Sequence, residues 1–83
     1  MSYSLDWYEA ALNIAAGYIK DDPDGVDELF DALGRLTDDP RPRKSKALTT
    51  PQLRRLRVGK YRVLYEIVDS VGSIIVIHVG RVG

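Results

Sequence analysis

The 83-residue sequence has no cysteine and only one histidine, so it can form neither a disulfide framework nor a cysteine- or histidine-based metal site. It also lacks a glycine-rich phosphate loop, a recognisably spaced serine, histidine and acid set, and an N-terminal targeting segment. The longest apolar run, near Ile74 to Ile77, is far too short to span a bilayer. We therefore expect a cytoplasmic protein without metal, cofactor or membrane contact, and any enzyme built on this chain would act mainly by positioning and electrostatics.

The formal net charge is zero, but the charges are segregated along the chain. Residues 1–39 hold ten acids and two bases, a balance of −8, whereas residues 40–83 hold ten bases and two acids, a balance of +8. This asymmetry is typical of a protein with one surface for a nucleic acid or an acidic protein. The alternative is a neutral globule with solvated charged faces. The length predicts one domain over residues 1–83.

The acidic half is predicted to begin with a short segment and a helix. The alternation of Tyr3 and Leu5 within residues 1–5 is compatible with an edge strand. Asp6 and Glu9 have the spacing of a capping box, which predicts a helix from Trp7 that ends near Asp21, before Pro23. The residues expected on its apolar face are Trp7, Ala11, Ile14, Ala15, Tyr18 and Ile19.

A second helix is predicted directly after the first, with Asp22 or Asp24 as its N-cap and its end near Leu36 or Thr37. Its connection to the first helix is short, which is typical of an antiparallel helical hairpin. Helical spacing gives it an apolar face of Val26, Leu29, Phe30 and Leu33.

The basic half is predicted to form a surface loop and then an antiparallel meander. Residues 38–52 combine three prolines with Arg41, Arg43, Lys44 and Lys46, which indicates an exposed basic loop. The remainder is rich in β-branched residues and is divided by turns at Gly59 and at residues 69–72. We therefore predict an α+β fold in which the helical hairpin packs on a meander of strands 53–58, 61–68 and 73–79.

Arginines are concentrated on the predicted sheet. A hairpin that turns at Gly59 would bring Arg57 close to Arg62, and alternation separates Arg55 and Arg57 from Arg54. Like charges that face each other across strands repel, so their juxtaposition suggests that an anion normally lies between them. Guanidinium groups match the geometry of phosphate, although arginines on an exposed strand face can also be simply solvated.

Three further side chains have two interpretations each. His78 could act as an acid or a base, because histidine titrates near neutrality, but on simple alternation it shares a face with Ile74 and Val76, which favours a structural role. Tyr61 and Tyr65 share a strand face and could stack on bases, whereas packing in the core is the more common use of such tyrosines.

Two segments together resemble the RelE/ParE superfamily of bacterial toxin–antitoxin toxins. They are Leu53-Arg-Arg-Leu-Arg-Val-Gly-Lys-Tyr-Arg-Val-Leu-Tyr-Glu-Ile67 and Ile74-Ile-Val-Ile-His-Val-Gly80. Residues 39–42 and 46–48 also resemble the family's approach to the sheet. The resemblance implies a compact toxin with two helices on an antiparallel sheet. It also implies a cognate RelB-like antitoxin that blocks the active surface, and contact with operator DNA only through the toxin–antitoxin complex.

RelE-type members cut messenger RNA on the ribosome, and the resemblance implies roles for single residues here. Arg62 matches the arginine that holds the scissile phosphate, Arg55 a basic position that stabilises charge during cleavage, and Arg57 a neighbouring basic position. With His78 these form the expected catalytic set. The residues expected to contact RNA or its phosphates are Lys44, Lys46, Arg54, Lys60 and Arg81.

The sequence departs from the RelE pattern after Val79 and Gly80, where the family continues with basic residues and a tyrosine or histidine that helps proton transfer. Arginine does not readily lose a proton, so the general base would have to be His78, a lysine, or a group of the ribosome or RNA. We therefore keep three functional hypotheses. They are a ribosome-dependent mRNA endonuclease, a non-catalytic gyrase inhibitor of ParE type, and an attenuated toxin that acts mainly in antitoxin binding and operon autoregulation.

Overall fold

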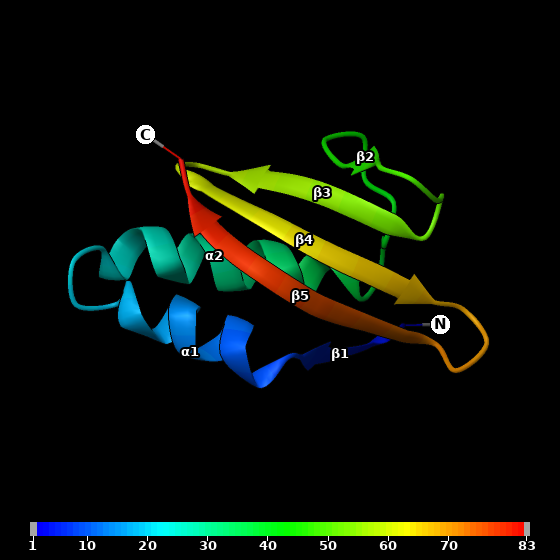
Figure 1. The fold of residues 1–83 in the computed structure, drawn as a ribbon, viewed down its shortest axis with the longest axis horizontal. Helices are drawn as coiled ribbons and strands as arrows, with labels where there is room; N and C mark the ends of the chain where they lie inside the picture. The colour runs from blue at the N-terminus through cyan, green and yellow to red at the C-terminus, as the bar shows by residue number, and fades with distance from the viewer. Residues whose placement is uncertain (1, 83) are drawn as a thin grey trace.

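The computed structural model describes residues 2–82, which form two helices packed on one face of a five-stranded mixed sheet (Figure 1). The strand order is β1-β5-β4-β3-β2; β1 runs parallel to β5 and the other neighbours are antiparallel. The elements are β1 (Ser4–Trp7), α1 (Glu9–Gly17), α2 (Pro23–Leu36), β2 (Lys46–Ala47), β3 (Leu53–Val58), β4 (Tyr61–Val68) and β5 (Ser73–Arg81).

The predicted α+β architecture and the meander β3-β4-β5 are confirmed. The meander lies at the centre of the sheet, and β1 and the two-residue β2 extend it on either side. The third strand continues to Arg81, two residues beyond the prediction. Between β3 and β4, Gly59 adopts a φ of 58°, a conformation that glycine takes without steric cost. The hairpin therefore turns where the sequence indicated.

The start of the first helix was predicted wrongly, because strand pairing overrides the local capping signal. Asp6 and Trp7 belong to β1, which pairs in parallel with β5 over Ser4–Trp7. The carboxylate of Asp6 accepts a hydrogen bond from the hydroxyl of Ser73 instead of capping a helix. α1 begins at Glu9 after Tyr8, whose side chain makes no cap hydrogen bond. The edge strand expected over residues 1–5 is thus shifted to Ser4–Trp7, and Met1 lies outside the described residues.

The end of the first helix also differs from the prediction. α1 stops at Gly17, and turns occupy residues 18–21. Of the predicted apolar face, Ala11 and Ala15 are buried, whereas Ile14 and Ile19 are 39% and 43% exposed. Because the helix is only nine residues long, Ile19 lies outside it and Ile14 lies on its flank.

The second helix follows its prediction closely. Asp22 is the N-cap and its carboxylate accepts a hydrogen bond from the backbone N–H of Gly25 at 3.2 Å, while Pro23 occupies the first helical position. Val26, Leu29 and Leu33 are buried, and Phe30 packs edge-on against Trp7 with ring centroids 5.6 Å apart. α2 therefore supplies most of the helical contribution to the core.

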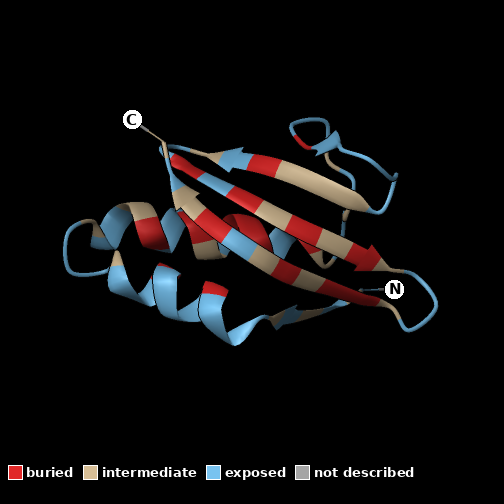
Figure 2. Ribbon diagram, in the orientation of Figure 1, coloured by how far each residue is buried: buried red, intermediate tan, exposed pale blue. Residues whose placement is uncertain are grey.

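The core lies between the helices and one face of the sheet, which we call the inner face. Along β4 every second residue is buried, and these residues are Tyr61, Val63, Tyr65 and Ile67 (Figure 2). Tyr61 and Tyr65 are thus core residues and not exposed platforms for bases. The opposite face of the sheet, the outer face, is covered by no helix within residues 2–82 (Figure 1).

The loop between α2 and β2 is fixed by polar contacts. The Tyr65 hydroxyl donates to the Pro40 carbonyl at 2.7 Å, and the Arg41 guanidinium donates to Asp69 in the β4–β5 turn at 3.1 Å. The Tyr3 hydroxyl donates to the same carboxylate at 2.7 Å. The hydrogen bond from Tyr3, followed by the smaller effect of the bond from Arg41, lowers the pKa of Asp69 below its usual value.

Asp22 joins the helical hairpin to the sheet. Besides capping α2, its carboxylate accepts a hydrogen bond from the Tyr61 hydroxyl at 2.8 Å and lies 3.5 Å from the Lys60 ammonium. The Tyr61 bond, the Gly25 bond and the charge of Lys60 lower the pKa of Asp22. Burial and the bond to Asp22 raise the pKa of Tyr61. The ionised carboxylate is therefore the form that the folded protein favours.

This arrangement predicts acid sensitivity. Since the folded-state pKa values of Asp22 and Asp69 are lowered, the stability that they contribute is complete above the unfolded carboxyl pKa of about 3.9 and is lost as pH falls through the folded values. We expect Asp22→Asn to unfold at a lower temperature than the wild type at pH 7, and its unfolding temperature to fall less on acidification. Thermal unfolding followed by circular dichroism between pH 7 and pH 2 tests this, with the exposed Asp31→Asn as control. Equal pH dependence of the wild type and Asp22→Asn would contradict it.

Candidate functional site

The outer face of the sheet gathers most of the predicted catalytic residues. Arg57 of β3 lies directly opposite Arg62 of β4, and Arg55 lies opposite Leu64. Side chains that are opposite each other across neighbouring strands share a face. Arg57 and Arg62 are exposed, and Arg55 is half-buried. Together they form what we call the arginine cluster, defined as Arg55, Arg57 and Arg62.

The arginine cluster has no carboxylate partner within residues 2–82. The ion pairs of this part of the chain are Arg41–Asp69, Lys60–Asp22 and Arg81–Asp21. The one hydrogen bond from the cluster is donated by Arg57 Nε to the Gly59 carbonyl at 3.1 Å. Three guanidinium groups on adjacent strands therefore offer their remaining donors to solvent or to an anion.

Lys46 and His78 complete a row across the outer face. In register, Lys46 of β2 faces Arg55, Arg55 faces Leu64, and Leu64 faces His78 of β5. Lys46 and His78 are both exposed. His78 is therefore exposed on the outer face. Simple alternation had instead placed it on the same face as the buried Ile74 and Val76.

The position of His78 results from a β-bulge. Leu64 pairs with His78 and the next residue, Tyr65, pairs with Val76, which leaves Ile77 without a partner on β4. Such an extra residue reverses the alternation of the strand beyond it. Val76 and Val79 are thus both buried, and His78 between them points to the outer face.

The other predicted phosphate ligands lie elsewhere. Arg54 is on the inner side of β3, where its guanidinium donates to the hydroxyl and the carbonyl of Ser45 at 2.8 and 3.2 Å and fixes the loop. Arg81 stacks on the Tyr18 ring at 4.3 Å and lies 3.9 Å from Asp21. Lys60, in the β3–β4 turn, is paired with Asp22. The geometry gives these three residues structural contacts and does not bring them to the arginine cluster.

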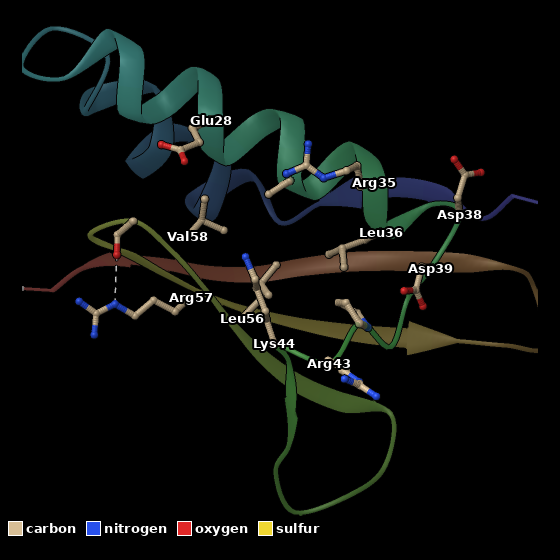
Figure 3. Close-up of a pocket in the computed structure, with 13 residues that line it drawn as sticks. Glu28, Arg35, Leu36, Asp38, Asp39, Arg43, Lys44, Leu56, Arg57 and Val58 are labelled. Carbon is tan, nitrogen blue, oxygen red and sulfur yellow. Dashed lines mark hydrogen bonds between the residues drawn. The ribbon is translucent and has the colours of Figure 1, made fainter.

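Lys44 lines a groove of about 660 Å³, to which Arg57 of the arginine cluster also contributes (Figure 3). The groove runs between α2, the loop that follows it and the β3–β4 hairpin, and its rim carries both acids and bases, among them Glu28, Asp39 and Arg43. Its floor is made by Leu36, Leu56 and Val58. The groove therefore has mixed charge, and it meets the arginine cluster at Arg57, which lines one end of it.

The outer face also carries an ionisable residue, Glu66, that was not predicted as a site residue from the sequence. Glu66 lies two residues after Leu64 on β4, is half-buried, and has Leu53 and Ile75 as its cross-strand neighbours. The alternation of β4 places it on the same face as Arg62. Its position relative to His78 could not be predicted from the sequence, because it depends on the register between β4 and β5.

Comparison with known proteins identifies the family. A family model described as the ParE toxin of the type II toxin–antitoxin system parDE matches residues 6–82. This chain belongs to the ParE toxin family. It is therefore a toxin of a type II toxin–antitoxin system within the RelE/ParE superfamily. A search of curated protein sequences finds no match.

Solved structures show the same fold as this toxin. A double arginine-to-alanine mutant of E. coli RelE in the free state is 28% identical, with a TM-score of 0.79 over 98% of this chain and 84% of that chain. The intact E. coli RelBE toxin–antitoxin complex gives 25% identity and a TM-score of 0.75 over 99% of both chains. The archaeal RelE–RelB complex from Pyrococcus horikoshii gives 21% identity and a TM-score of 0.83 over 100% and 98%.

Two features of the described part of the toxin bear on metals and membranes. Within residues 2–82 no group of three or more histidine, aspartate or glutamate side chains is arranged to hold a metal ion. In the same residues no helix is both long and apolar enough to cross a membrane.

The arginine cluster predicts a specific response to anions. Phosphate bound between Arg57 and Arg62 would relieve their repulsion, so we expect inorganic phosphate to raise the unfolding temperature of the wild type more than sodium chloride of equal ionic strength. Because phosphate also stabilises proteins in general, the comparison must be made with Arg62→Ala, in which the extra increase should be much smaller. Differential scanning fluorimetry measures both, and Arg35→Ala on α2 is the matched control. The same increase in all three proteins would contradict an anion site.

Proposed function

We propose that the toxin is a ribosome-dependent mRNA endonuclease of the cytoplasm that inhibits translation and is neutralised by a RelB-like antitoxin. The observation that carries this proposal is the arginine cluster, which occupies an uncovered sheet face without carboxylate partners in residues 2–82. The 28% identity with E. coli RelE supports it. The chemistry to be supported is attack of a ribose 2′-hydroxyl on the adjacent phosphate.

In that reaction negative charge grows on the phosphate oxygens. Preorganised guanidinium groups stabilise such charge most strongly in the transition state, and they are charged at every physiological pH. Arg62, on the central strand β4, would hold the scissile phosphate, while Arg55 and Arg57 would bind the growing charge from β3. Lys46, in line with Arg55, would contact the neighbouring backbone phosphate.

The proposed antitoxin partner follows from the relatives. The E. coli and P. horikoshii relatives were solved in complexes with RelB. A segment of such an antitoxin that carries acidic side chains would complement the arginine cluster and block access of RNA to it. Operator DNA would be bound only by the toxin–antitoxin complex, because the toxin alone also presents the acidic side chains of α2.

The nuclease proposal predicts cuts in translated messages. Expression of the toxin without its antitoxin in bacteria should stop growth and produce new mRNA 5′ ends inside codons, which primer extension maps. Arg62→Ala should reduce the cleavage rate by about 100- to 1000-fold, the usual effect of removing one donor to a developing oxyanion. Binding to the antitoxin should largely persist.

Arg35→Ala is the matched control, because Arg35 is exposed on α2, on the other side of the sheet from the arginine cluster. This variant should cleave mRNA at the wild-type rate. Arrested growth without new 5′ ends would exclude the nuclease. Normal growth together with tight antitoxin binding would point to an attenuated toxin that serves mainly in autoregulation.

The alternative function is inhibition of DNA gyrase without catalysis. The observation that favours it is the matching family model, which describes the ParE toxin of the parDE system. A supercoiling assay with purified gyrase separates the two functions, because only the ParE-type reading predicts loss of supercoiling. If the toxin is a nuclease, gyrase should keep its full activity at a large molar excess of the toxin.

A further inference from the structure

Leu64 lies at the centre of a ring of ionisable side chains on the outer face. Along β4 it is flanked at two residues on either side by Arg62 and Glu66, which point the same way. Across the strands it is faced by Arg55 on β3 and by His78 on β5. Two arginines, one carboxylate and one imidazole therefore surround a single aliphatic position.

The imidazole of His78 leans toward Arg62. A Cβ placed on Gly80 would lie 3.4 Å from His78 Nε2, so the ring extends along β5 over this glycine. Gly80 is the cross-strand partner of Arg62. Because Gly80 has no side chain, the space beside Arg62 is left to the imidazole.

The carboxylate of Glu66 stands apart from the cations of the same face. Its cross-strand neighbours, Leu53 and Ile75, are apolar, and no ion pair of Glu66 occurs within residues 2–82. Asp6, which lies in the same cross-strand row on the far side of Ile75, accepts a hydrogen bond from the Ser73 hydroxyl. Glu66 is thus the carboxylate on this face that is not committed to a partner in the described structure.

We propose that Glu66 and His78 are the acid/base pair of the cleavage reaction, an assignment that rests on the proposed nuclease function. The Glu66 carboxylate takes the proton of the ribose 2′-hydroxyl, and the 2′-oxygen forms a bond to phosphorus. The bond between phosphorus and the 5′-oxygen breaks, and the His78 imidazolium gives its proton to the departing 5′-oxygen. The products are a 2′,3′-cyclic phosphate and a 5′-hydroxyl, with no oxidant, reductant or metal consumed.

This division of labour agrees with the chemistry of the four groups. The arginines cannot exchange protons at physiological pH and serve only as fixed charges for the phosphate oxygens. Within the ring around Leu64, the carboxylate and the imidazole are the two side-chain types that can accept and donate a proton. Leu64 supplies an apolar floor, near which electrostatic contacts are stronger than in open water.

The test compares two substrates on programmed ribosomes: an ordinary mRNA, and one whose scissile phosphate carries sulfur in place of the 5′-oxygen. A thiolate leaves without being protonated, so the second substrate needs no general acid. We expect Glu66→Gln to be slower by about 100- to 10,000-fold on both substrates. His78→Asn should be slowed to a similar extent on the oxygen substrate and restored toward the wild-type rate on the sulfur substrate.

Asp31→Asn, another exposed carboxylate but on α2, should match the wild type on both substrates. The ratio of rates on the two substrates is taken within one variant, so it does not depend on how much of that variant is folded. End analysis of the products should show the cyclic phosphate.

Two results would overturn the pair. They are cleavage by Glu66→Gln at the wild-type rate, or His78→Asn slowed equally on both substrates, in either case while Arg62→Ala is inactive and the wild type cuts. In that event the nuclease function stands and only the acid/base assignment fails. A wild-type toxin that cuts neither substrate would reject the nuclease function and the pair together.

Discussion

The burial of only one face of β4 is the constraint on which the rest of the structure depends. Tyr61, Val63, Tyr65 and Ile67 are almost completely buried under the helices. Since alternate side chains of a strand point to opposite faces, this burial turns Arg62, Leu64 and Glu66 to the other side. The register of both neighbouring strands is fixed by the same core, so the hydrophobic effect, rather than any polar contact, places the charged side chains.

The segregation of charge along the sequence becomes a segregation in space. The acidic residues of the N-terminal half lie largely on and around the helices, while the basic residues of the C-terminal half supply the sheet and its loop. Where the two sets do meet, as at Asp22 with Lys60 and Asp21 with Arg81, they fasten the hairpin of helices to the end of the sheet. The arginine cluster is left outside this pairing.

Local patterns in the sequence predicted most of the fold, because most of it is decided locally. The β4 alternation, the turn at Gly59 and the Asp22 cap of α2 each depend on residues close in the chain. The parallel pairing of β1 with β5 joins residues about seventy positions apart, and it took Asp6 away from the helix it was expected to cap. No short-range pattern contains that information.

The candidate site divides in the same way. Alternation and one hairpin were enough to bring Arg55, Arg57 and Arg62 together, whereas Arg54 and Arg81 were separated from them by tertiary contacts with Ser45 and Tyr18. The face of His78 could not be predicted, because the bulge arises from packing on both sides of it, where Val76 and Val79 are both buried. The position of Glu66 relative to His78 depends on the same bulge, because it sets the register between β4 and β5.

The bulge at Ile77 couples the orientation of His78 to the packing of the core. If β5 kept all its residues but paired with β4 without the bulge, the side chains from position 78 onward would change faces, so that Val79 would enter water and the imidazole would enter the core. The exposure of His78 is thus tied to the burial of Val79. The imidazole of His78 is kept on the outer face by the packing of Val79 in the core. The strand cannot turn His78 inward without removing Val79 from the core.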